Sequence, residues 1–307
     1  MASLIREIVD LHRRQLFGVI EVRGVGRMRR LYADARGELE AKLRRLTRTG
    51  RGDTFGAQHL RMVLTQVSDT VATFEKDLVH HMDQTGRMAG NLAPKHLVSM
   101  VGKMEEKFGH MTPVIQVAQA AVVRGAYPEV ARTLLDKYRE SAAFYGPETM
   151  RAIRTGLSHS IIQEETVDEA VGRVVETDGL FDAQRWRAER IVRTEMSYSY
   201  HVTNQRGLEQ LAPSVPKLMK RLVTTHDDRT GEDSIELDGQ TVPVDQPFVW
   251  VVKDARGTPT GKVVRYMSPP NRPNDRETVI PWVQGWAEPS QVTDLGGVRP
   301  SVPSDLG

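Results

Sequence analysis

The character of this 307-residue chain changes once, after Pro213. Before that point, over residues 3–211, apolar residues recur at the spacing of amphipathic helices, with charged residues between them. Beyond it, strand-like runs occupy residues 218–225, 248–253 and 262–266, and turn-forming residues separate them. The sequence therefore predicts an α+β fold with a mostly helical N-terminal region.

Glycine, proline and capping residues divide the helical region into successive helices. Gly86, Gly90 and Pro94 predict the end of one long helix, since glycine and proline punctuate local structure. Thr166 and Glu169 have the spacing of a capping box, in which each side chain bonds the other's backbone N–H at a helix N-terminus. We expect helices over residues 3–20, 28–46, 57–80, 95–108, 114–126, 129–144, 150–163 and 166–175, and from Asp182 to Gln205 or Leu208.

Composition excludes several classes of protein. There is no cysteine, so neither a disulfide framework nor a thiolate metal site is available. No apolar run approaches the roughly 18 residues of a membrane span, so we expect no membrane partner. Charged residues interrupt the start of the chain, where a signal peptide would need an apolar stretch. We therefore expect the protein to be made and used in a cytoplasm.

Residues 11–50 are strongly basic, with ten arginines and one lysine against four acidic residues. The whole chain has a formal charge of only +2, so this excess is local. Arginines neutralise nucleic-acid phosphates without reading sequence, which makes double-stranded DNA a candidate ligand. An arginine-rich helix can equally be a solvated surface, or it can dock on an acidic protein. The candidate DNA contacts are Arg29, Arg30, Arg44 and Arg45.

A group of polar residues after the first strand-like run contains His226, Asp227 and Asp228, with Glu232 and Asp233 close by. Such a group could hold a divalent metal ion in a hydrolase or nuclease. The alternative is structural, with aspartates that accept backbone N–H bonds in a tight turn and an arginine that pairs with a carboxylate. We favour the structural interpretation and predict no catalytic residue, no cofactor and no bound metal.

The same segment belongs to a longer pattern. It begins with Arg193, Thr194 and Glu195 on the predicted helix that starts at Asp182. It continues through His226, Asp227, Asp228, Arg229 and Thr230, then Leu237, Asp238 and Gly239, and finally Asp245 and Phe248. In order and spacing, this pattern resembles the signature of the Mu F-like head morphogenesis proteins of tailed bacteriophages.

Two departures from the family pattern bear on metal binding. Many members carry His or Cys between the D-R-T and L-D-G motifs, where this chain has Ser234 or a neighbour. Members often close with His and Cys where this chain has Arg272, Asp275 and Glu277. Tetrahedral zinc prefers thiolate and imidazole ligands, so we expect this module to be metal-free.

We expect the motif residues to act structurally before they act in recognition. A buried Arg193 or Glu195 that pins its helix to the loop of residues 226–230 would explain polar side chains in a packed helix. Direct contact with a partner is the alternative. Asp238 and Gly239 form a turn dipeptide, because glycine adopts a positive φ at little cost.

The resemblance completes the predicted organisation. Residues 1–179 form a helical region, residues 180–287 form a Mu F-like module of one long helix plus a small antiparallel β-sheet, and residues 288–307 form a flexible tail. Members of the family are minor head proteins. The resemblance thus implies a virion protein that is not an enzyme and that associates with the portal vertex during procapsid assembly.

The implied partners are the portal protein first, then the scaffold or major capsid protein, and packaged double-stranded DNA. Two other functions stay open. One is an internal DNA-associated ejection protein, for which the arginine-rich segment is the relevant feature. The other is a metal-dependent hydrolase that uses the loop of His226, Asp227 and Asp228.

Overall fold

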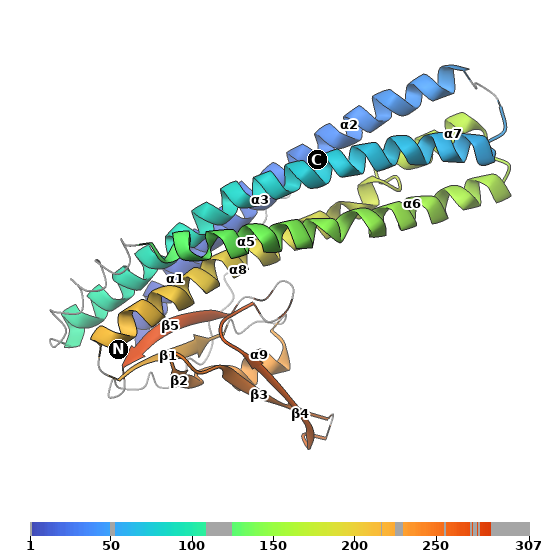
Figure 1. Ribbon diagram of the computed structural model, residues 1–307. Coiled ribbons are helices and arrows are strands. Elements are labelled where there is room, and N and C mark those ends of the chain that lie inside the picture. Colours follow the sequence, from blue (N-terminus) through green and yellow to red (C-terminus); the bar gives the residue numbers. More distant parts are fainter. Residues whose placement is uncertain are drawn as a thin grey trace. The chain divides into compact units, whose positions relative to one another are not determined.

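The protein has an α+β fold, with a helical N-terminal region and small antiparallel sheets, as the sequence predicts (Figure 1). The computed structural model describes residues 2–49, 53–108, 125–215, 217–224, 230–254, 256–270, 272, 275 and 277–283. The helices are α1 (Ala2–Phe17), a π-helix (Gly18–Val25), α2 (Gly26–Thr49), α3 (Ala57–Phe108), α5 (Ala126–Ala143), α6 (Tyr145–Ile162), α7 (Val167–Val175), α8 (Arg185–Leu211) and α9 (Glu232–Leu237). Short 3₁₀ turns cover Asp182–Gln184 and Ala212–Ser214. The strands are β1 (Leu218–Val223), β2 (Thr241–Pro243), β3 (Phe248–Lys253), β4 (Pro259–Tyr266) and β5 (Thr278–Val283).

The chain forms two compact units that interleave along the sequence. The sheet unit consists of Met1–Gln15, Asn91–Ala126 and Tyr200–Gly307, and the helical unit consists of Leu16–Gly90 and Tyr127–Ser199. The division predicted from the sequence is a different one, because its boundary at residues 179 and 180 falls inside the helical unit. The predicted tail, residues 288–307, lies outside the described residues.

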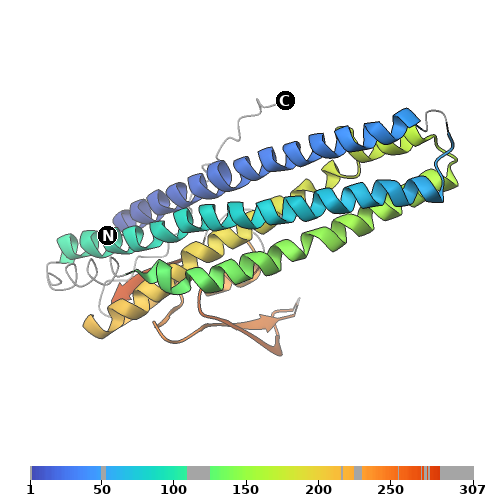
Figure 2. The ribbon, with the colours of Figure 1, turned by 45° about the horizontal axis from the view of Figure 1, so that its top comes forward.

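In the helical unit, the helices lie side by side (Figure 2). Buried aromatic rings pack against one another between them. Tyr32 of α2 meets Phe74 of α3 edge to face, with ring centroids 5.1 Å apart. The Tyr145 hydroxyl donates a hydrogen bond of 2.9 Å to the Tyr32 hydroxyl, which in turn donates to the Phe181 carbonyl oxygen. Buried tyrosines need such partners for their hydroxyl groups. The ring cluster therefore buries apolar surface and also gives the hydroxyl groups of Tyr32 and Tyr145 hydrogen-bond partners.

The predicted end of a helix at Gly86, Gly90 and Pro94 is wrong, because α3 continues for 52 residues with Pro94 inside it. In the helical unit, a Cβ atom on Gly86 would collide with the Tyr138 ring, and one on Gly90 would collide with the Tyr127 ring. These glycines thus allow α5 tyrosines to approach the helix backbone. Their role is close packing, not helix termination.

The capping box is confirmed at the start of α7. The Glu169 carboxylate accepts the backbone N–H of Thr166 at 2.8 Å, and the Thr166 hydroxyl oxygen accepts the backbone N–H of Glu169 at 3.3 Å. The long helix predicted from Asp182 begins instead with a 3₁₀ turn, and α8 itself starts at Arg185. Capping depends on residues three positions apart, which is why the sequence alone reveals it.

The described strands of the sheet unit form two antiparallel sheets. One sheet has the strand order β2-β1-β5, and β3 pairs with β4 in a separate hairpin (Figure 1). The sequence predicts β1, β3 and part of β4 but misses β2, β5 and α9. Pro281 lies within β5 and weakens its strand signal, yet β5 is an edge strand, where a missing N–H donor is tolerated.

The C-terminal part of α8 is tied to the strands of the sheet unit. Asn204 donates a side-chain hydrogen bond of 3.0 Å to the carbonyl oxygen of Val279 in β5. Gln205 donates one of 2.8 Å to the carbonyl oxygen of Val244, just after β2. The apolar residues that pack in this core include Leu208, Leu211, Leu218, Leu222, Leu237, Val244 and Phe248. Adjacent polar residues on one helix therefore hold two different strand segments.

Candidate functional site

Arg193, the first residue of the R-T-E triplet, sits in a network of charges within the helical unit. Its guanidinium donates to both carboxylate oxygens of Glu21, at 2.7 and 3.1 Å, and to Glu189 at 3.2 Å. Arg29 of α2 pairs with the same Glu189, at 2.9 and 3.1 Å. Burial works to raise the pKa of Glu189, but the hydrogen bonds and charge of the two arginines lower it. The network holds α2, α8 and the π-helix together.

The π-helix, Gly18–Val25, carries Glu21 into this network. Its Gly24 lies against α8, where a Cβ atom would be 3.1 Å from a Val192 methyl carbon. The carbonyl oxygen of Gly24 is 2.7 Å from Nε2 of His81. π-Helical turns are rare and often occur at functional sites. Here the described contacts of the π-helix are internal to the helical unit.

Glu195, the third residue of the triplet, is buried on the same helix. Its carboxylate accepts a hydrogen bond of 2.9 Å from the Ser141 hydroxyl, and the Lys137 ammonium lies 3.8 Å away. Burial raises the pKa of Glu195, although Lys137 and Ser141 oppose that shift. Thr194 donates its hydroxyl to the Arg190 carbonyl oxygen one turn earlier.

The triplet therefore makes its described contacts inside the helical unit. The contact predicted between the triplet and the loop of residues 226–230 cannot be followed, because His226, Asp227, Asp228 and Arg229 lie outside the described residues. Thr230 is described and is half-buried just before α9. The structural role predicted for the His226, Asp227 and Asp228 group therefore stays a prediction, and the metal site stays its alternative.

The L-D-G-Q residues form a turn that fastens the sheet unit. The Asp238 carboxylate accepts the backbone N–H of Thr224 at 2.8 Å, beyond the end of β1. Gly239 has a φ of +77°, which confirms the predicted glycine turn. The Gln240 side chain bonds both backbone groups of Val249 in β3, at 2.9 and 3.0 Å.

The remaining motif residues of the sheet unit divide between core and surface. Leu237 and Phe248 are fully buried and belong to the same hydrophobic cluster. Asp245 is exposed in the turn between β2 and β3. Motif positions in this unit are therefore mostly structural, and Asp245 is the exposed member among those described.

Four positions where the family pattern suggests metal ligands come together in the sheet unit. The Arg272 guanidinium donates to the Ser234 hydroxyl oxygen at 2.6 Å and also forms an ion pair with Asp233. Asp275 and Glu277 act on Arg272 through their charges, and Glu277 hydrogen-bonds with Ser234. A permanently charged guanidinium thus lies among carboxylates. Within the described residues, no group of three or more histidine, aspartate or glutamate side chains is arranged to hold a metal ion.

Glu277 is the most deeply buried acid of this cluster, with 2% of its surface exposed. Burial raises its pKa, and the nearby charge of Asp275 raises it further. The Tyr266 hydroxyl donates to it at 2.8 Å. An acid with a raised pKa can serve as a proton donor, but this one is sealed from solvent, which favours a structural role.

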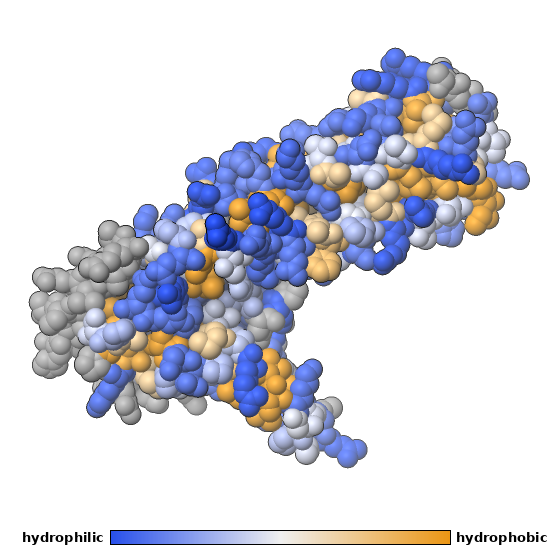
Figure 3. Space-filling view, in the orientation of Figure 1, coloured by the Kyte–Doolittle hydropathy of each residue, from blue (hydrophilic) through white to orange (hydrophobic). Residues whose placement is uncertain are grey.

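The basic residues of α2 fall into two kinds. Arg29 pairs with Glu189, and Arg44 pairs with Glu40 one turn earlier, at 2.7 Å. All four arginines are exposed, and among the described residues Arg30 and Arg45 form no ion pair. Hydrophilic residues predominate along the visible side of α2 (Figure 3). Of the four predicted DNA contacts, Arg30 and Arg45 are therefore the ones best placed to meet a phosphate.

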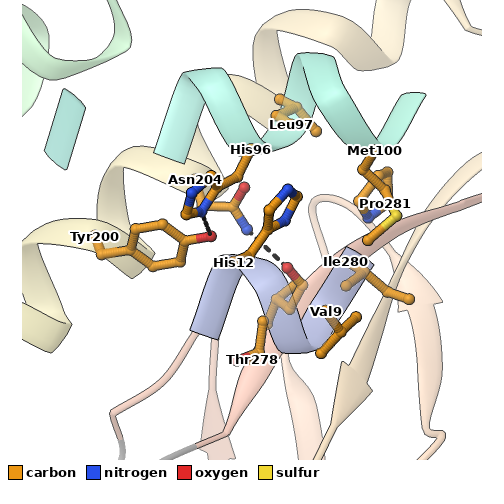
Figure 4. A pocket seen from close by; sticks show the side chains of 11 residues that line it. Val9, His12, His96, Leu97, Met100, Tyr200, Asn204, Thr278, Ile280 and Pro281 are labelled. Carbon is orange, nitrogen blue, oxygen red and sulfur yellow. Dashed lines mark hydrogen bonds between the residues drawn. The ribbon is translucent and has the colours of Figure 1, made fainter. Parts of the chain in front are cut away.

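The sequence gives no signal for a histidine pair that lines a small pocket of the sheet unit (Figure 4). The rings of His12 and His96 stack in parallel, with centroids 3.9 Å apart. His96 is 2.9 Å from the Tyr200 hydroxyl and 2.7 Å from the Gln15 amide oxygen. These residues come from three helical segments far apart in the sequence, so no spacing rule reveals them.

No family model, curated protein or solved structure matches the chain. The similarity to the Mu F-like proteins therefore rests on the motif residues themselves. Among the described helices, none combines the length and the apolarity that crossing a bilayer requires.

Proposed function

We propose that the protein is a Mu F-like minor head protein of a tailed bacteriophage or prophage, which binds the portal vertex during procapsid assembly. The observation that carries this proposal is the gathering of Ser234, Arg272, Asp275 and Glu277 in one cluster. In the family these positions often carry His or Cys, which a shared metal site would bring together. In this chain 38 positions separate Ser234 from Arg272. Such a gathering is expected if the pattern reflects a shared fold.

The described motif residues support a role without catalysis. Asp238, Gly239 and Gln240 form internal backbone contacts, and Leu237 and Phe248 are buried. Recognition would then fall on exposed surfaces. The β3–β4 hairpin, with exposed Val251 and Val263, is one such surface, and the basic side of α2 is another. The proposed location is the portal vertex of the virion, with scaffold or major capsid protein as further partners.

The test is co-purification of the full chain with the portal protein encoded beside it, followed by native mass spectrometry. We expect a defined complex with the portal ring. Two surface variants locate the contact: Val251→Asp with Val263→Asp on the hairpin, and Arg30→Glu with Arg45→Glu on α2. A folded chain that leaves an intact portal ring unbound would refute the proposal.

A second candidate is an internal DNA-associated protein, favoured by the exposed Arg30 and Arg45. This function predicts binding to duplex DNA that weakens steeply with salt, since each phosphate contact releases counterions. Fluorescence anisotropy with a short duplex measures it at low and moderate salt. Arg30→Ala with Arg45→Ala should abolish binding. Arg139→Ala with Arg151→Ala, which removes the same charge from exposed positions on α5 and α6, serves as the matched control.

A further inference from the structure

Lys220 is a lysine in the hydrophobic core of the sheet unit. In β1, the buried positions alternate, so Lys220 faces the same side as Leu218 and Leu222. Its surface is 0% exposed. Its ammonium donates to the Gln205 amide oxygen at 3.0 Å and to the Met267 carbonyl oxygen at 2.7 Å. Burying a cation against neutral acceptors is costly. A lysine here therefore calls for an explanation beyond packing.

The carboxamide of Gln205 is held rigidly against this lysine. Its nitrogen donates to the Glu209 carboxylate at 2.9 Å and to the Val244 carbonyl oxygen at 2.8 Å. Two acceptors on the nitrogen side and an amine on the oxygen side fix which atom is oxygen. An amine, a primary amide and a carboxylate thus lie in one contact chain from Lys220 to Gln205 to Glu209.

We propose that Lys220 and Gln205 join in an intramolecular isopeptide bond, with Glu209 as the proton relay. The neutral Nζ of Lys220 attacks Cδ of Gln205, and the carbonyl electrons move to Oε1. The Glu209 carboxylate, whose charge acts on Lys220, takes one proton from Nζ and passes that proton to Nε2, to which it is hydrogen-bonded. The C–N bond of the primary amide then breaks as the carbonyl re-forms, and ammonia leaves. The products are a secondary amide and one ammonia, with no oxidant or other reactant.

Position and environment both favour this reaction. The hydrogen bond holds Nζ 3.0 Å from Oε1 of the carboxamide whose carbon it attacks. Where such neighbours reach a near-attack geometry, the effective concentration can be about 10⁵ M or more. Burial lowers the pKa of Lys220 to about 8, although the charges of Glu209 and Asp245 oppose the shift. About a tenth of the amine is then neutral and nucleophilic at pH 7, and about half at pH 8. The Phe248 ring, with its centroid 5.1 Å from Nζ, helps to exclude water that would compete as a nucleophile.

The bond would fasten α8 covalently to β1, the central strand of the three-stranded sheet (Figure 1). It would also replace a buried cation with a neutral amide, which removes the cost of the charge. The bond lies within the sheet unit and would form whether or not the protein binds a portal. A failed portal experiment would leave it unaffected.

The test is the intact mass of the purified, folded full chain after incubation at a pH above 8. We expect a mass lower than that of the sequence by one ammonia. Trypsin should then release a branched peptide, in which TEMSYSYHVTNQR (residues 194–206) is joined to LMKR (residues 218–221). Its fragmentation spectrum should place the link between Gln205 and Lys220.

Two variants make the result specific. Lys220→Arg keeps a cation and its donors but removes the amine nucleophile, so its mass should equal that of its sequence. Glu209→Gln keeps the hydrogen bond but cannot relay a proton. The link should therefore form at least about 10²-fold more slowly. The proposal is overturned if the folded wild-type chain keeps its full mass, or if the lost ammonia maps to other residues.

Discussion

The two units treat a buried or half-buried cation in opposite ways. In the helical unit, Arg193 lies between two carboxylates, Glu21 and Glu189. In the sheet unit, Lys220 is more deeply buried and donates to an amide oxygen and a backbone carbonyl. A paired charge recovers much of its desolvation cost, whereas a cation among neutral acceptors recovers less. Ion pairs thus stabilise the helical unit, whereas apolar packing must offset the desolvation cost of the cation in the sheet unit.

The largest expected effect tests whether apolar packing holds the sheet unit. Phe248 is fully buried and lies beside Lys220. Phe248→Ala should lower the free energy of unfolding of this unit by about 3–5 kcal/mol, because it leaves a cavity. Urea unfolding monitored by the change in tryptophan fluorescence measures the loss. Phe248→Leu should cost much less, because it keeps most of the buried apolar volume. A negligible loss for Phe248→Ala would mean that packing at this site is unimportant.

The next effect concerns His12 and His96, which are neutral in the folded sheet unit. Burial and the charge of Lys103 lower the pKa of His12 to about 4, and burial, His12 and Lys95 lower that of His96 to about 3. In the unfolded chain these histidines bind protons at a higher pH, near 6.5. The unfolded state therefore binds more protons between pH 6.5 and these lowered values, and stability falls as pH decreases through that window.

For His12 alone the loss should be on the order of 3 kcal/mol between pH 6.5 and pH 4. Urea unfolding at pH 7, 5 and 4 should show it in the wild type. His12→Phe keeps a ring for stacking but removes the titration, so its stability should fall less over the same range. Parallel pH profiles for the two proteins would contradict the assignment.

Breaking the charge network of the helical unit should cause a smaller loss of stability. Arg193→Ala leaves Glu21 and Glu189 facing each other without their shared cation, which should cost about 2 kcal/mol. Arg193→Lys keeps the charge but loses the two-pronged contact, so it should fall between wild type and alanine. Thermal unfolding followed by circular dichroism ranks the three proteins. If lysine is as poor as alanine, geometry outweighs charge in this network.

A substitution at Gly239 tests how much the turn before β2 contributes to stability. The positive φ of Gly239 disfavours a Cβ atom, and that atom would also lie 2.9 Å from the Arg221 guanidinium. Gly239→Ala should therefore lower stability by about 1 kcal/mol. Gly257 also has a positive φ but open space around it, so Gly257→Ala isolates the backbone contribution. A larger loss at Gly239 than at Gly257 would show that the Arg221 contact matters.

The smallest expected loss of stability comes from an exposed ion pair of the helical unit. The Arg44–Glu40 pair is exposed on α2 and spans one helical turn. Arg44→Ala should change stability by only about 0.5 kcal/mol, because water screens such pairs. The contrast with Arg193→Ala, measured under the same conditions, tests whether burial gives the charge network its strength.

How far the sequence predicts this structure depends on the distance between the partners. The capping box of Thr166 and Glu169 and the turn at Gly239 involve near neighbours, and both are predicted. Glu21 and Arg193 are 172 positions apart, and no local pattern pairs them. The packing role of Gly86 is missed for the same reason, since Tyr138 comes from another helix.

Lys220 is an intermediate case. The run LMKRLV alternates, so the sequence places Lys220 in register with Leu218 and Leu222 once the strand is recognised. Only the fold reveals that Gln205 and Glu209 converge on it from α8. The sequence predicts that the L-D-G residues form a turn, but it does not predict which groups they hydrogen-bond.

The interleaving of the units has a consequence for synthesis on the ribosome. In the sheet unit, Ile8 and Val9 from the start of the chain pack with Ile280 and Trp282 of β5. Ile8 and Val9 are translated long before Ile280 and Trp282, so they leave the ribosome before their partners exist. Contacts between residues so distant in sequence also make folding slow. The nascent chain must therefore keep this apolar helix face uncovered until β5 has been translated, so we expect expression of the protein to depend on chaperones.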